Sequence, residues 1–242
     1  YNVEYALASS ETWQSVAQNS KQATFNLTGL SSQTDYKVRV QSACGSEWRE
    51  AYFTTAVEAP SVGDSGSDDF EGSTCGWNLV NGSLTNAWAW GTAANHGGTK
   101  GLYISNDGGT SNAYTNSYTM VYATKLLYFA EGKYQFSYNW RANGEKAFDY
   151  LRVALVPASK TLTASEDIPN GFTVSTLPEG WMALDGGRAL NEKSEWQRKE
   201  AVANVSGTYY LVFAWRNDHH NQDDADKNPP AAIDNVSITK IT

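Results

Sequence analysis

The stretch Asp68-Asp69-Phe70-Glu71-Gly72, followed by Cys75-Gly76-Trp77, opens the larger part of this chain, and Ala231-Ala232-Ile233-Asp234-Asn235-Val236-Ser237-Ile238-Thr239 closes it. Each stretch combines acidic side chains with apolar or aromatic ones. The closing stretch ends in the alternation of apolar and polar residues that is typical of a half-buried strand. We therefore expect one domain to occupy residues 68–242, with its first and last strands side by side.

Strand-like runs separated by turn residues fill the interval between these two stretches. They show no long helical period. The runs lie at 87–90, 101–105, 120–123, 133–140, 149–156, 195–200, 207–215 and 232–239. So many short runs with turn clusters between them predict an all-β fold, in which two sheets pack face to face as a jelly-roll β-sandwich.

The composition agrees with a folded β-protein and excludes several classes of function. Of the 242 residues, 40% are hydrophobic and 13% aromatic, so the chain can bury a full core. No stretch reaches the roughly 18 consecutive apolar residues of a membrane helix, and we expect no membrane insertion. The formal net charge is -8, whereas nucleic-acid binding depends on clustered Lys and Arg. Cations, neutral sugars or proteins are the expected partners.

A second, smaller segment precedes the large domain. Leu30 lies six residues before Tyr36, which opens the alternating run Tyr36-Lys37-Val38-Arg39-Val40. This spacing is typical of a tyrosine corner, in which the phenol bonds to backbone upstream. Residues 1–56 therefore resemble the C-terminal part of a fibronectin type III domain, entered at its third strand, with 51–55 as its last strand.

The fibronectin resemblance leaves a gap. Such sandwiches contain roughly 100 residues, and about half of that number is present here, so the first two strands of the family are absent. Without them the apolar face of the remaining sheet is left uncovered. We expect these strands to come from upstream polypeptide of the same parent protein or from a partner chain.

Residues 57–67 are rich in Gly, Ser and Pro and show no periodicity, which predicts a linker. Beyond it, a series of motifs resembles the MAM domain and its bacterial relatives, the cleaved-adhesin and choice-of-anchor modules. The series is Phe70-Glu71, Cys75-Gly76-Trp77, a Trp before a Gly-Leu-Tyr-Ile strand, Tyr-x-Phe-x-Tyr, Asp-Tyr-Leu-Arg-Val, a lone Trp196 and Ala-Ile-Asp-Asn-Val. The resemblance covers 68–242 and implies an exported, non-catalytic adhesion module at the cell surface or outside the cell.

One departure from the animal MAM pattern concerns a disulfide. Those domains carry a cysteine just before Phe-Glu that pairs with the cysteine matching Cys75, and this chain has Asp69 there. That bridge cannot form. A bridge between Cys44 and Cys75 would join the two segments in an exported protein, and two separate buried thiols are the alternative.

Carboxylates at the domain ends predict a structural calcium site. Glu71 and Asp234 lie on the first and last strands, and calcium takes six to eight oxygen ligands. The oxygen-rich loop 105–110 adds two candidate ligands, and two further carboxylates lie elsewhere. The complete predicted set is Asp69, Glu71, Asn106, Asp107, Asp149 and Asp234. In the alternative interpretation, Glu71 and Asp234 only cap strands or accept hydrogen bonds from turn amides, and Asp107 belongs to an ordinary turn.

The segment 216–230 is the most polar part of the chain, and we expect it to form a loop at one end of the sandwich, where binding loops usually lie. Its candidate ligand contacts are Asp218, His219, His220 and Asp223. A transition-metal site is disfavoured because adjacent side chains on an extended segment point in opposite directions.

Aromatic rings bind sugars through their apolar faces, so the tryptophans are candidates for carbohydrate contact. The tryptophans of the second segment are Trp77, Trp88, Trp90, Trp140, Trp181, Trp196 and Trp215. Most lie in alternating strands and are more simply core residues. Trp181 lies in the irregular sequence Leu177-Pro178-Glu179-Gly180-Trp181 and is the best candidate for an exposed ring.

The sequence contains no nucleophile elbow, no zinc-protease helix motif and no phosphate-binding glycine loop, so we do not expect an enzyme. The leading hypothesis is a non-catalytic adhesion or recognition segment of a larger exported bacterial protein, which contacts a host or cell-surface protein or glycan. The alternative is a carbohydrate-binding accessory module of a secreted glycosidase or protease. A purely structural spacer is the third class.

Overall fold

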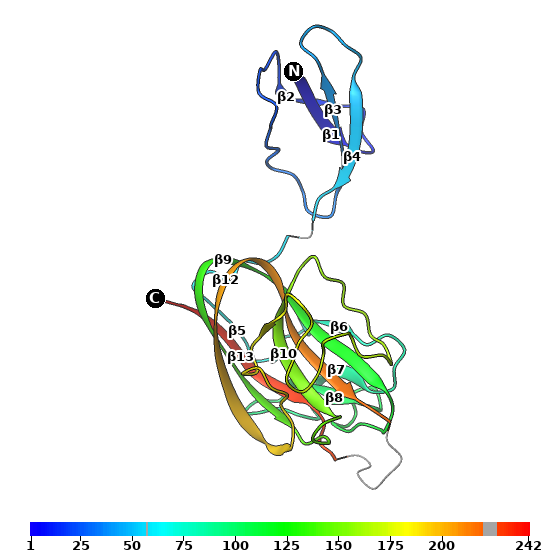
Figure 1. Cartoon of the computed structure of the whole chain (residues 1–242), viewed down its shortest axis with the longest axis vertical. Helices are drawn as coiled ribbons and strands as arrows, with labels where there is room; N and C mark the ends of the chain where they lie inside the picture. Colours follow the sequence, from blue (N-terminus) through cyan, green and yellow to red (C-terminus); the bar gives the residue numbers. More distant parts are fainter. Residues whose placement is uncertain (57, 220–226) are drawn as a thin grey trace. The chain divides into compact units, whose positions relative to one another are not determined.

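The computed structural model describes residues 1–56, 58–219 and 227–242. The chain forms two compact units, unit 1 (Tyr1–Ala59) and unit 2 (Pro60–Thr242) (Figure 1). Within the described ranges every regular element is a β-strand, so the predicted all-β class is confirmed. No helix in this part of the chain is long and apolar enough to cross a membrane.

Unit 1 is a single antiparallel sheet. Its strands are β1 (Asn2–Leu7), β2 (Gln14–Ala17), β3 (Asp35–Gln41) and β4 (Arg49–Thr54), in the spatial order β2-β1-β3-β4. The Tyr36 hydroxyl accepts a hydrogen bond from the Ser31 amide at 3.0 Å, as expected for a tyrosine corner. Arg39 stacks between Trp13 and Trp48 and pairs with Glu4 at 2.6 Å.

The alternating run at residues 23–27 forms no strand. No neighbouring strand lies within the described part of unit 1 to pair with it, although Phe25 and Leu27 are half-buried. The buried apolar clusters of the described chain also include no residue of unit 1. These features agree with a sheet that lacks its partner, and the fibronectin assignment and the source of further strands stay predictions.

Unit 2 is built around two very long strands. Its elements are β5 (Ser65–Asp68), β6 (Asn78–Val80), β7 (Ala87–Gly91), β8 (Gly101–Ser105), β9 (Thr119–Ala142), β10 (Tyr150–Pro157), β11 (Met182–Ala183), β12 (Lys193–Asn217) and β13 (Ala232–Ile241). The spatial order is β11-β10-β12-β9-β13-β8-β7, with β5 on β13 and β6 on β9. Figure 1 shows β9 and β12 as paired, strongly curved ribbons.

The curvature of β9 and β12 lets the same two strands serve both layers of the sandwich. Residues 119–129 of β9 pair with 207–217 of β12 in the layer of β6 and β10. Residues of β9 between 133 and 141 pair with β13 in the other layer. The register shifts between Val205 and Gly207, and Gly207 has a φ of 104°, which favours glycine. The main core fills the space between the layers and includes Trp88, Trp140 and Trp215.

A long excursion between β10 and β12, residues 158–190, covers the outer face of the β6-β9-β12-β10 layer. We call it the strap. Its side chains Phe172 and Trp181 pack with Tyr122 and Tyr150 of the sheet in a second apolar cluster. An ion pair holds it down: Arg152 on β10, 1% exposed, donates to Asp185 of the strap, 0% exposed, at 2.6 Å. Arg152 also donates to the Thr173 and Thr176 carbonyls.

The predicted linker 57–67 is too long, because its second half belongs to unit 2. The Val62 amide donates to the Tyr128 carbonyl at 3.0 Å, and the Val62 side chain is buried in the main core. Residues 65–68 then form β5 on the edge of β13. The sequence did not indicate this role, because the segment is rich in Gly and Ser and only one of its apolar residues, Val62, packs into the core.

Candidate functional site

A hollow between the strap and β9 is a candidate site. Its volume is about 350 Å³, which lies within the roughly 300–1,000 Å³ of ligand pockets. Its lining residues are Tyr122, Lys160, Thr161, Leu162, Thr163, Pro169, Pro178, Glu179 and Trp181. We call it the Trp181 hollow. Its floor comes from the sheet and its walls come from the strap.

Trp181 is held in place by local structure on both sides. The Trp181 amide donates to the Pro178 carbonyl at 3.1 Å and closes a turn, in which Gly180 has a φ of 86°. Directly afterwards β11 pairs with β10. The indole meets Phe172 edge-on with ring centroids 6.1 Å apart, and meets Tyr122 at 6.4 Å. The ring is therefore positioned before any ligand arrives.

Several polar groups of the Trp181 hollow have no partner among the described residues. No hydrogen bond joins the Tyr122 hydroxyl or the Trp181 indole N–H to this part of the protein, and Lys160 and Glu179 form no ion pair within it. Burial raises the pKa of Tyr122, so its hydroxyl is a neutral donor and acceptor. These groups keep hydrogen-bonding capacity for a ligand.

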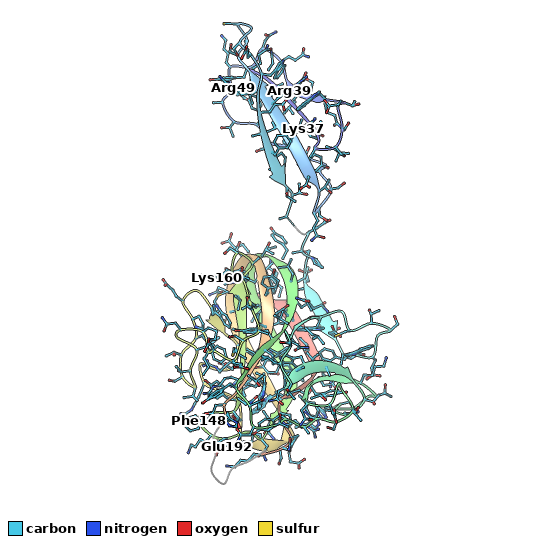
Figure 2. All side chains as sticks on the ribbon, turned by 90° about the vertical axis from the view of Figure 1, so that its right-hand side faces the viewer. Lys37, Arg39, Arg49, Phe148, Lys160 and Glu192 are labelled. Atoms are coloured by element: carbon cyan, nitrogen blue, oxygen red, sulfur yellow. The ribbon has the colours of Figure 1, made fainter. Side chains whose placement is uncertain are left out.

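A second hollow adjoins the first. Its volume is about 230 Å³, and its lining residues are Asn78, Val80, Thr124, Ala158, Ser159, Lys160, Thr161, Leu162 and Tyr210. We call it the Tyr210 hollow. The segment 160–162 of the strap lines both hollows, and Lys160 is exposed at the surface of unit 2 (Figure 2). The two hollows together form a groove with aromatic, amide and hydroxyl groups.

The two carboxylates at the domain ends bind turn amides. Glu71 accepts hydrogen bonds from the Thr99 hydroxyl at 2.5 Å and from the Thr99 and Lys100 amides at 2.8 Å. The bond from the Thr99 hydroxyl is the main cause of a lowered Glu71 pKa. Asp234 accepts from the His96 amide at 2.5 Å and the Asn235 amide at 2.7 Å, and burial raises its pKa.

The predicted calcium ligands do not form one site. Lys100, which contacts Glu71, precedes β8, whereas Asn106 and Asp107 follow it at the opposite end of the strand. Asp107 is held by the Ser105 and Ser111 hydroxyls, which lower its pKa to about 2. Among the described residues no three His, Cys, Asp or Glu side chains gather as a metal site. The six-residue calcium shell is therefore wrong, and calcium itself stays a prediction.

The remaining two carboxylates of the predicted set also serve local structure. Asp149 accepts hydrogen bonds from the Tyr114 hydroxyl at 2.7 Å and the Asp218 amide at 3.1 Å, and burial raises its pKa. Asp69 is exposed and accepts from the Glu71 amide at 3.2 Å. Neither carboxylate adds a ligand to the turn that binds Glu71 and Asp234.

Asp218 and His219, the two described residues of the predicted ligand contacts in the loop, do not line the groove. The Asp218 amide bonds to Asp149, and the exposed His219 ring lies 2.9 Å from the Asn116 carbonyl and beside Tyr118. His220 and Asp223 lie outside the described residues.

The two cysteines are free thiols in the structure, and neither is fully buried, unlike the two buried thiols of the alternative considered for them. Cys44 is exposed in unit 1, and Cys75 is half-buried in unit 2. Burial raises the pKa of the Cys75 thiol, which makes it a weak nucleophile.

Of the predicted ligand residues that the structure describes, only Trp181 lies in the groove. The sequence did not single out Tyr122, Lys160, Asn78 or Tyr210. Tyr122 and Tyr210 occur in alternating strands, where an aromatic residue indicates core. Only the course of the strap reveals that these strand positions face a hollow.

No protein-family model matches the sequence, and no curated protein matches it. Solved β-sandwich structures resemble it. The CBM22-1 xylan-binding domain from Paenibacillus barcinonensis is 14% identical, with 76% of this chain and 99% of that chain covered and a TM-score of 0.44. The K1 cleaved adhesin domain of Lys-gingipain from Porphyromonas gingivalis is 16% identical, with 74% of this chain and 100% of that chain covered and a TM-score of 0.42. TmCBM61, in complex with β-1,4-galactotriose, is 8% identical, with 68% of this chain and 88% of that chain covered and a TM-score of 0.37. At these scores, inference about function rests on this chain's own residues.

Proposed function

We propose that the chain is a non-catalytic, extracellular recognition segment that binds a glycan in the groove between the strap and the sheet. The observation that carries the proposal is the pair Trp181 and Tyr122. Both line one hollow, and the polar group of each lacks a partner among the described residues. A binding module needs side chains that are held in place to contact a ligand, and it needs no catalytic groups. The strap holds Trp181 in place, and the sheet holds Tyr122.

The chemistry of the hollow fits a sugar better than other ligands of similar size. A pyranose presents an apolar C–H face, which packs on an aromatic ring, and a rim of hydroxyls, which need donors and acceptors. The Tyr122 hydroxyl, the indole N–H and the Thr161 and Thr163 side chains offer both. The lining holds one cation and one anion, Lys160 and Glu179, so it lacks the cation cluster that phosphate or nucleic acid requires.

Trp181→Ala is expected to weaken glycan binding about ten-fold, because a stacked aromatic pair contributes up to roughly 1.5 kcal/mol beyond area burial and about 1.4 kcal/mol corresponds to a factor of ten. A glycan array selects the sugar, and isothermal titration measures the loss. Tyr122→Phe is the sharper companion: it keeps the packed ring and removes only the unpartnered hydroxyl. It should lower affinity and leave the melting temperature unchanged.

Tyr52→Ala is the matched control, since Tyr52 is 67% exposed in unit 1. Its loss should change neither the glycan affinity nor the melting temperature. Equal binding by Trp181→Ala and the unmodified protein would contradict the proposal. The array also separates two uses of the groove. Binding to host or cell-surface glycans indicates adhesion, whereas binding to polysaccharide fragments indicates an accessory module of a secreted enzyme.

A further inference from the structure

We infer that the groove takes a linear, uncharged oligosaccharide that spans both hollows, and not a single terminal sugar. This inference rests on the proposed glycan binding and adds the ligand's length and charge. Its first support is that the two hollows are adjacent, since Lys160, Thr161 and Leu162 line both.

The floors of the two hollows are consecutive positions on one face of β9. Tyr122 floors the Trp181 hollow and Thr124 floors the Tyr210 hollow. Alternate residues of a strand share a face and lie about 6–7 Å apart. That spacing is comparable to one pyranose unit of an extended chain, so neighbouring sugar units can occupy neighbouring hollows.

Each hollow offers the same combination of groups. The Trp181 hollow has an indole and the Tyr122 hydroxyl. The Tyr210 hollow has a phenol and the Asn78 amide, and no hydrogen bond joins the Tyr210 hydroxyl or the Asn78 side chain to another described residue. Asn78 lies directly opposite Thr124 in the pairing of β6 with β9. Two repeats of aromatic surface and free polar group match a ligand with repeating units.

The charges of the groove favour an uncharged chain. Lys160 stands between the hollows, and Glu179 lies beside Trp181. A chain of uronic acids or sulfated sugars carries a negative charge on each unit. One of these charges could lie near Lys160, but the others would lie near Glu179 or near side chains that carry no positive charge. A neutral chain uses both charged groups as hydrogen-bond partners for its hydroxyls.

Titration calorimetry with β-1,4-linked glucose, xylose and mannose oligosaccharides of one to six units, and with the matching uronic acid series, tests the inference. Affinity should rise at least about ten-fold from the single sugar to the longer chains of a neutral series. The double variant Asn78→Ala/Tyr210→Phe should remove that rise and keep the affinity for the single sugar. Trp181→Ala should weaken all lengths. Asn204→Ala, an exposed amide on β12 outside the groove, is the control and should change nothing.

Three results would overturn the inference. Equal affinity for all lengths, with binding still lost in Trp181→Ala, means a single-sugar site and leaves the proposed glycan binding intact. Stronger binding of the uronic acid series, abolished by Lys160→Met, means a ligand of the opposite charge class. Binding of no glycan on the array or in calorimetry refutes the proposed function itself, and this inference with it.

Discussion

Asp185→Ala is expected to lower the free energy of unfolding of unit 2 by about 3–5 kcal/mol, the usual loss when one partner of a buried ion pair is removed. The variant leaves the Arg152 guanidinium charged, almost fully buried and without its carboxylate. It also removes the acceptor of the Val153 and Gly187 amides. The strap then loses its strongest attachment to β10, and glycan affinity should fall with it because the strap forms the groove walls.

Thermal melts and urea titrations measure this loss, and a domain of this size should melt on the order of 10 °C lower. Glu200→Ala is the control: its ion pair with Arg198 is half-exposed on both sides, and such pairs contribute about 0–1 kcal/mol. The double variant Arg152→Met/Asp185→Leu should recover only part of the stability, since apolar residues can replace a buried pair but leave the Val153 and Gly187 amides without their acceptor. Equal melting of Asp185→Ala and Glu200→Ala would refute the attachment role.

Trp215→Ala should be comparably damaging, with an expected cost of about 3–5 kcal/mol for a fully buried large aromatic residue. Trp215 is 0% exposed in the main core and meets Tyr114 edge-on at 5.5 Å. Its indole donates to the Asn217 side chain at 2.9 Å, and the same oxygen accepts from Asn86 at 3.2 Å. The substitution therefore opens a cavity and loosens a buried polar network.

Chemical unfolding of Trp215→Ala tests this expectation beside Tyr118→Ala, whose side chain is 52% exposed and whose loss should change stability by no more than about 0.5 kcal/mol. Near-wild-type stability of Trp215→Ala would mean that the core collapses around the cavity. Trp181→Ala supplies a useful contrast, because it should reduce glycan binding far more than stability.

The strands were predictable where a short strand-like run is bounded by turn residues. The alternating run around Tyr36 predicted β3 and its corner, and the run Gly101–Ser105, whose residues are all buried, predicted β8. The run at 23–27 has the same alternation and forms no strand, because a strand also needs a neighbour for its backbone. Pattern alone therefore predicts the capacity to pair and not the pairing.

The site was less predictable, for two physical reasons. The calcium hypothesis placed Asp107 beside Glu71. Glu71 instead binds the turn before β8, and five residues of extended strand separate that turn from Asp107, at a rise of about 3.3 Å per residue. The Trp181 hollow in turn depends on the strap, whose irregular sequence has no period. Trp181 was predicted as a ligand residue because the sequence around it is irregular. Tyr122 was not, because it lies in a strand-like run, where an aromatic residue indicates a core position.

The seating of Val62 and β5 also determines how unit 2 bears mechanical load. Unit 1 is joined to unit 2 through Pro60, and the next residues are already fixed, Val62 in the core and 65–68 along β13. Tension transmitted along the polypeptide therefore enters at Pro60 and Val62, whose backbone hydrogen bonds to Tyr128 of β9 take the pull first. The ladder between β5 and β13 bears load only after those bonds break.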